Sequence, residues 1–119
     1  MRFVWVGLAG AIGSVLRYTI GLHVDQSKFP WATLAINISG SFVLALFLTL
    51  TLGRWSVSVT APIAVGFVGG YTTFSTFAFD GFTMGRSGRM LAATIYVCVS
   101  VLGGLAAAWI GYALGRAFR

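Results

Sequence analysis

Residues 29–53 read FPWATLAINISGSFVLALFLTLTLG and contain no Asp, Glu, Lys or Arg. A helix that spans a bilayer needs about 20 consecutive apolar residues, so this run is long enough to cross one. Two more charge-free runs cover residues 55–79 and 90–115, and a fourth run, residues 3–22, is interrupted only by Arg17. The sequence therefore predicts an all-α membrane protein with four transmembrane helices.

The overall composition favours the same class. Only 8% of the 119 residues are charged, whereas a soluble domain carries about 25% charged residues. The first run follows Arg2, as in a signal peptide, but it is Gly-rich and contains Arg17, so we interpret it as a retained helix. We expect a multi-pass protein of the cell membrane with one transmembrane domain. Its expected helices cover about residues 2–22, 30–52, 58–84 and 89–116.

No catalytic constellation is present. The chain has one His, one Cys and two carboxylates, which form no plausible triad or metal cluster. The net charge of +6 would suggest nucleic acid in a soluble protein. Here the basic residues lie mainly at the ends of the predicted spans, where lipid headgroups explain them. We therefore expect no enzyme activity, no organic cofactor and no nucleic-acid partner, but contact with membrane lipid.

Lys and Arg are balanced between the two ends of the predicted bundle. The basic residues of one end are Arg2, Arg54, Arg116 and Arg119. Those of the other end are Lys28, Arg86 and Arg89, with Arg17 close to it. Because an excess of Lys and Arg sets orientation, this balance gives no strong preference. It suits a chain that inserts both ways and pairs antiparallel, or one that is oriented by another signal.

Residues 66–77 read GFVGGYTTFSTF, in which three glycines are followed by hydroxyl residues. Glycine costs up to about 1 kcal/mol in a helix interior. Non-helical backbone at membrane depth persists only where it is buried in protein or faces water, and such breaks commonly form ion sites. We therefore predict a break in the third helix near Gly69 to Ser75. The alternative is that the glycines only allow close helix packing.

Three residues near this segment are candidates for anion contact. Phe74 and Phe77 are three apart and share a helical face. The positive edge of a phenyl ring can meet an anion, although such residues more often face lipid or the core. Asn37 should face protein or water, because an unpaired buried amide costs about 2–7 kcal/mol. Its NH2 group could donate to an anion or hold another helix.

The last predicted helix and two charged residues complete the candidates. Tyr96 and Ser100 are four apart on one face, and Gly104 continues that face without a polar group. Their hydroxyls alone do not select an anion over a cation.

Arg17 and Asp80 are the charges expected within or just inside the spans, so both are functional candidates. Arg17 is expected to face water or to snorkel to the interface. Asp80 could pair with Arg86 or Arg89 near the following loop.

The sequence resembles the Fluc (CrcB) family of small fluoride channels over nearly its whole length. Three motifs carry the resemblance, GAIGSVLRY at residues 10–18, FPWATLAINISGSF at 29–42 and GGYTTFSTF at 69–77. Ala32 stands where glycine is usual, and the third motif is the most specific. The resemblance implies an antiparallel, dual-topology homodimer with two pores, through which fluoride leaves the cell passively.

The resemblance also implies roles for individual residues. A structural sodium ion would sit at the dimer centre, held by the backbone carbonyls of Gly69 and Thr72. The implied pore residues are Asn37, Phe74, Ser75, Thr76, Phe77, Tyr96 and Ser100. Arg17 matches the basic residue of the vestibule, and Asp80 matches the acidic residue that follows the third motif. Tyr96 and Ser100 match a row of polar residues along the fourth helix of the family. Gly104 replaces a residue of that row that is often Ser or Thr, so the far end of the row departs from the family pattern.

Two other classes of membrane protein compete with this interpretation. A small multidrug-type cation/proton antiporter can also have four spans, but it needs a membrane carboxylate, and the first helix has none. Asp80 is the sole candidate, and it lies near a helix end. An accessory membrane subunit would leave the hydroxyl-rich third helix and Asn37 unexplained.

Overall fold

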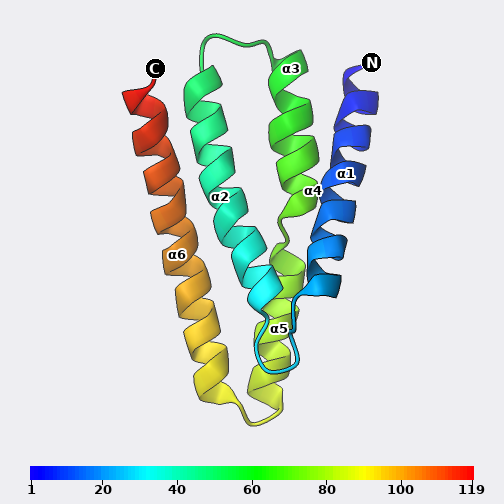
Figure 1. Cartoon of the computed structure of the whole chain (residues 1–119), viewed down its shortest axis with the longest axis vertical. Coiled ribbons are helices and arrows are strands. Elements are labelled where there is room, and N and C mark those ends of the chain that lie inside the picture. Colours follow the sequence, from blue (N-terminus) through cyan, green and yellow to red (C-terminus); the bar gives the residue numbers. More distant parts are fainter.

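The computed structural model describes residues 1–119 and contains only helices and the loops that join them. Four helical stretches are long and apolar enough to cross a membrane, Arg2–His23 (α1), Trp31–Thr51 (α2), Val57–Arg86 and Met90–Ala117 (α6). They lie side by side, and both termini lie at the end of the bundle that carries the α2–α3 connection (Figure 1). The predicted all-α, multi-pass architecture is confirmed, and each bound lies within two residues of the expected one.

The third stretch is not one uniform helix. It consists of α3 (Val57–Ala61), a π-helix (Pro62–Val68), α4 (Gly69–Tyr71) and α5 (Phe74–Arg86). The π-helix begins at Pro62, which has no N–H to donate, so the regular α-helical ladder is already disturbed there.

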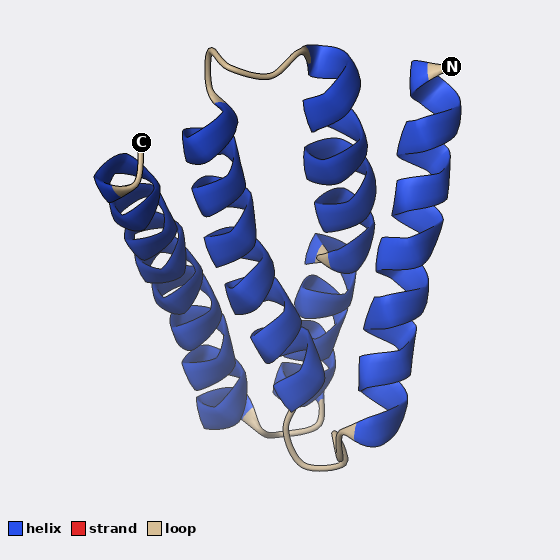
Figure 2. Cartoon of the chain, turned by 45° about the horizontal axis from the view of Figure 1, so that its top comes forward, coloured by secondary structure: helices blue, strands red, loops and turns tan.

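The chain leaves the helix at Thr72 and Thr73, whose φ/ψ angles of −82°/160° and −153°/117° are extended. Figure 2 shows this interruption as a short loop segment inside the third stretch. The predicted break is confirmed, and it is narrower than the expected range because Gly69–Tyr71 remain helical.

The break divides the third stretch between two neighbours. The π-helix and α4 pack against α1, whereas α5 packs against α6, which also runs along α2 (Figure 1). Close approach of α1 depends on Gly13, because a Cβ there would lie 2.2 Å from the carbonyl oxygen of Phe67. Likewise, a Cβ at Gly111 would lie 2.4 Å from the carbonyl oxygen of Phe42 in α2. Glycines therefore serve close packing in addition to the break.

The alanine substitution Gly13→Ala is expected to destabilise the subunit by about 1–3 kcal/mol, because the new methyl group must push α1 away from backbone atoms. Gly7→Ala in the same helix is the matched control, since a Cβ at Gly7 meets no atom within 4 Å. Thermal unfolding in detergent should show a lower Tm for Gly13→Ala alone. Equal Tm values for the two variants would contradict the close contact.

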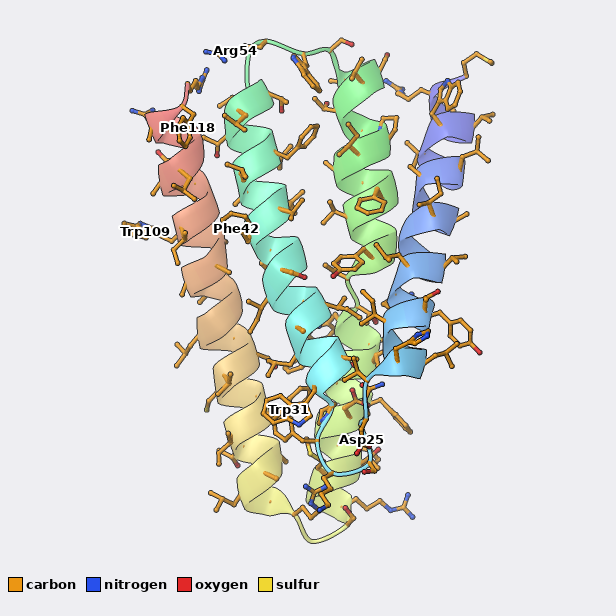
Figure 3. The ribbon with its side chains drawn as sticks, viewed as in Figure 1. Asp25, Trp31, Phe42, Arg54, Trp109 and Phe118 are labelled. Atoms are coloured by element: carbon orange, nitrogen blue, oxygen red, sulfur yellow. The ribbon has the colours of Figure 1, made fainter.

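The surface of the subunit is that of a membrane protein. Only 18 of 119 residues are buried, and many large apolar side chains are exposed, so lipid or another protein surface must cover them. Trp109 projects from α6 away from the bundle, while Arg54 and Phe118 lie at one end and Asp25 and Trp31 near the other (Figure 3). Charged and aromatic side chains at both ends are typical of the membrane interfaces.

Candidate functional site

The side chain of Asn37 in α2 forms hydrogen bonds with the backbone of Thr73 in the break of the third stretch. Its Nδ2 donates to the carbonyl oxygen of Thr73 at 3.0 Å, and its Oδ1 accepts from the N–H of Thr73 at 2.8 Å. The amide thus replaces the helical partners that the Thr73 backbone lacks. Gly40 allows this approach, because a Cβ there would lie 2.1 Å from Cγ2 of Thr72. The interhelical role of Asn37 is observed, and the second N–H of its NH2 group remains for another acceptor.

Thr73 is also the N-cap residue of α5. Its Oγ1 accepts from the N–H of Thr76 at 3.2 Å and donates to Oγ1 of Thr76 at 3.1 Å. This is the N-cap arrangement that favours Thr at the start of a helix. The N–H groups of Phe74 and Ser75 lie in the first turn, where a helix offers no internal acceptor. The positive end of the α5 dipole therefore points into the break.

Arg17 in α1 contacts the break from the opposite side. Its Nε donates to the carbonyl oxygen of Gly70 at 3.1 Å, and Oγ of Ser14 donates to the same oxygen at 3.4 Å. Arg17 also lines a cavity of about 290 Å³ together with Thr33, Thr76 and other residues. The predicted vestibule residue thus lines a cavity and also holds the backbone of the third stretch.

A second cleft, of about 330 Å³, lies on the other side of the break. It brings together four of the predicted pore residues, Asn37, Phe74, Phe77 and Ser100. The ring centroids of Phe74 and Phe77 are 5.8 Å apart with planes tilted by 53°. Phe74 is 78% exposed on the isolated subunit. Amide and hydroxyl donors therefore line the same cleft as two aromatic rings.

The hydroxyl of Ser100 is the one buried side-chain polar atom without a hydrogen-bond partner. Buried hydroxyl groups are normally paired with protein or water. The other buried hydroxyl of α6 follows that rule, since Oη of Tyr96 donates to Oδ2 of Asp80 at 3.4 Å. The free donor of Ser100 lies where the cleft could hold a hydrogen-bond acceptor.

Of the remaining predicted site residues, Thr72 also lines the cleft, and the others lie outside it. Tyr96 is 0% exposed and packs in a core between α2, α5 and α6, with its ring centroid 5.3 Å from that of Phe77. Its Oη donates to Oδ2 of Asp80 at 3.4 Å. Asp80 is therefore bonded to Tyr96, and it forms no ion pair with an arginine of the following loop. The guanidinium of Arg89 donates instead to the carbonyl of Lys28.

The two predicted pore hydroxyls of the first turn of α5 both lie near Thr73, whose Oγ1 is 3.4 Å from Oγ of Ser75 and 3.1 Å from Oγ1 of Thr76. Thr76 lines the cavity of Arg17, and Ser75 is exposed at the start of α5. Thr73 and Ser14 contact the break but were not among the predicted site residues. A signal for Thr73 was present, because Ser and Thr are favoured at the N-cap position of a helix. Ser14 lies three residues before Arg17 and so shares its helical face.

Comparison with known proteins places this geometry in a family. The family model described as CrcB-like protein, Camphor Resistance (CrcB), matches residues 4–112. A relative named fluoride-specific ion channel FluC, from Acidobacterium capsulatum, is 37% identical over 98% of this chain and 97% of its own length. Another, FluC 2 from Geobacillus kaustophilus, is 40% identical over 100% and 96%. The FluC of Thermus thermophilus is 41% identical over 98% and 94%.

The three similarities extend through all four helical stretches, including the break and the cleft beside it. Each of these relatives is more than one third identical to this chain over nearly the whole length of both proteins. This four-helix membrane protein therefore belongs to the CrcB-like family.

Proposed function

We propose that this chain forms a channel through which fluoride crosses the cell membrane passively. The observation that carries the proposal is the cleft beside the break, where the unpaired hydroxyl of Ser100 and the amide of Asn37 lie with two phenyl rings. Relatives that match the chain over nearly their whole length are named fluoride-specific ion channels. No Asp or Glu lines the cleft, so no carboxylate repels an anion there.

The chemistry of the cleft suits a small, strongly hydrated anion. An ion that enters a narrow pore must exchange water for groups of the protein. Asn37 has an N–H to spare, Ser100 offers an O–H, and the edges of Phe74 and Phe77 carry partial positive charge. Because fluoride is smaller than chloride, a bore that just admits fluoride would exclude chloride. The ion gradient alone drives the flow.

We further propose that two copies pair antiparallel and form two pores. The 78% exposure of Phe74 supports this, because a pore ring on an open subunit surface needs a second surface opposite it. The balanced basic residues at the two ends support insertion in both orientations.

Cysteine crosslinking tests the arrangement in a Cys98→Ser background. Ser56 and Ser87 lie at opposite ends of the third stretch, so Ser56→Cys and Ser87→Cys label the two ends. An antiparallel pair should give crosslinks between position 56 of one copy and position 87 of the other. Crosslinks only between identical positions would contradict it.

A sodium ion at the dimer centre is the third part of the proposal. The N–H of Thr73 is taken by Asn37 and that of Thr76 by Oγ1 of Thr73. The carbonyls of Gly69 and Thr72 are thereby left without their helical donors, and Gly69 is exposed on the subunit surface. Unpaired carbonyl oxygens are suitable ligands for a hard cation. When bound, the ion would compensate the negative ends of these carbonyls and link the two subunits.

Fluoride efflux from proteoliposomes tests the central proposal. Vesicles loaded with potassium fluoride should lose it rapidly when valinomycin carries potassium out, as a fluoride electrode would record. The same vesicles loaded with chloride should lose little. Absence of fluoride efflux from well-folded protein would contradict the channel and direct attention to proton-coupled cation transport.

Ser100→Ala should reduce fluoride efflux about three- to tenfold, which is the effect expected for one hydrogen bond of about 0.5–1.5 kcal/mol to the ion. The Tm should stay unchanged, because the hydroxyl has no protein partner to lose. Thr94→Ala on the same helix is the control, since its hydroxyl bonds only to its own helix. Wild-type efflux in Ser100→Ala would remove Ser100 from the pathway.

A further inference from the structure

We propose that Arg17 acts as a positioning residue, whose Nε–H fixes the helix break through the Gly70 carbonyl. Its charge in the adjoining cavity is then secondary. This inference rests on the proposed channel function, and it changes the role that the sequence suggests for Arg17. The contact joins residues 53 positions apart in the chain and couples α1 to the centre of the third stretch.

The Gly70 carbonyl needs a partner from outside its own helix. In a continuous helix it would accept from the N–H of residue 74, but Phe74 begins a new helix after the break. Nε of Arg17 donates to it at 3.1 Å, and Ser14 contributes a longer bond of 3.4 Å. A cation is favoured at the carbonyl end of a helix, and hydrogen bonds from charged donors are about twice as strong as neutral ones. Arg17 is therefore the main partner of this carbonyl.

The break is held from both sides by side chains of different helices. Arg17 from α1 binds the carbonyl of Gly70, and Asn37 from α2 binds both backbone groups of Thr73. These bonds leave the carbonyls of Gly69 and Thr72 free of side-chain donors. Arg17 thus helps to decide which oxygens of the break are paired and which can face an ion.

Packing makes this contact short and direct. A Cβ at Gly70 would lie 2.5 Å from the carbonyl oxygen of Gly10, so α1 lies against α4 at this point. Arg17 is half-buried and lies seven residues, about two turns, after Gly10 on the same side of α1. Its guanidinium group has other N–H donors that reach into the cavity lined by Gln26 and Thr33. The role of the Nε–H donor can therefore be tested separately from the role of the guanidinium charge.

Three substitutions separate the two roles. Arg17→Gln places an amide nitrogen at the position of Nε and removes the charge. Arg17→Lys keeps the charge but places a methylene group at that position. Arg17→Met has a similar length and carries neither the donor nor the charge. The decisive comparison is between Gln and Met, which differ in the donor and not in charge.

If Arg17 positions the break, Arg17→Gln should keep fluoride efflux within about threefold of wild type, whereas Arg17→Met should lose at least about tenfold, the effect of one charge-assisted hydrogen bond. If its charge attracts the anion, Arg17→Lys should conduct well while Gln and Met fail together. Any result in which Gln is no better than Met, or in which Met matches wild type, overturns the inference. Thr19→Val, an exposed change on the same helix, should have no effect.

Hydrogen exchange provides a readout that does not depend on transport. Amides of residues 72–76 should exchange faster in Arg17→Met than in wild type, and at nearly the wild-type rate in Arg17→Gln. Equal exchange in the Met and Gln variants overturns the inference. If wild-type protein carries no fluoride but this exchange pattern is found, the channel proposal fails and the positioning role stands.

Discussion

Replacing Asn37 by leucine is expected to abolish fluoride efflux and to lower the Tm of the purified protein. The substitution leaves the N–H and the carbonyl of Thr73 without partners at membrane depth. Each unpaired buried group costs about 1–3 kcal/mol, so the break should lose about 2–6 kcal/mol. The pathway also loses an amide donor, and efflux should fall more than about a hundredfold, since each 1.4 kcal/mol is a factor of ten. Thermal unfolding in detergent and liposome efflux measure the two effects.

Two variants serve as controls for Asn37→Leu. Ser41→Ala removes a hydroxyl that donates only to the Asn37 carbonyl in its own helix, so its Tm should stay near that of wild type. Asn37→Asp keeps the acceptor for the Thr73 N–H but adds a negative charge beside the cleft. It should be more stable than Asn37→Leu and still carry little fluoride. A leucine variant with wild-type Tm would show that the Thr73 backbone does not depend on this amide.

The double variant Phe74→Ile/Phe77→Ile is expected to fold but to lose fluoride efflux by about a hundredfold. Isoleucine keeps most of the apolar volume and removes the positive ring edge. An aromatic pair is worth about 0.5–1.5 kcal/mol, and we take a ring-edge contact with an anion to be of the same order, so each ring could account for up to about tenfold. The single variants should each show a smaller loss, because one ring remains. The two losses need not add, because the rings are only 5.8 Å apart.

Phe79→Ile is the matched control for this pair. Phe79 lies in the same helix and is 66% exposed, but it does not line the cleft beside the break. Its replacement should leave efflux unchanged. Size-exclusion chromatography would verify that the double variant keeps the assembly state of wild type. A double variant that folds and conducts normally would exclude the two rings from the pathway.

The sequence predicted the spans and the break because both depend on local composition. The bilayer thickness sets the minimum length of a span at about 20 apolar residues, so charge-free runs of that length can be found in the sequence alone. The break was predicted from Gly69, Gly70 and the hydroxyl residues after them, which favour helix less than other residues do. The glycines themselves remain helical, however, and the chain leaves the helix at Thr72 and Thr73. Asn37 was identified as a residue that needs a polar partner, but the partner itself, the backbone of Thr73, could not be read from the sequence.

Other features depended on how neighbouring helices meet. Tyr96 and Ser100 share a helical face by spacing, yet Tyr96 packs in the core and only Ser100 lines the cleft. Spacing gives a direction around the helix and not the neighbour found at each height. Ser75 and Thr76 are adjacent, so their side chains leave the helix about 100° apart, and Thr76 lines the cavity beside Arg17 whereas Ser75 is exposed. The contact of Arg17 with Gly70 required the packing of α1 on α4.

The π-helix at Pro62–Val68 has an evolutionary consequence. Each of its hydrogen-bonded rings contains one residue more than an α-helical turn. Removing one residue there would restore ordinary α geometry and would leave the helix on either side in its original rotation. A deletion elsewhere in the third stretch would turn everything beyond it by about 100° and move Thr73 away from Asn37. This segment is therefore where a lineage could gain or lose a single codon while the pathway beyond it keeps its alignment.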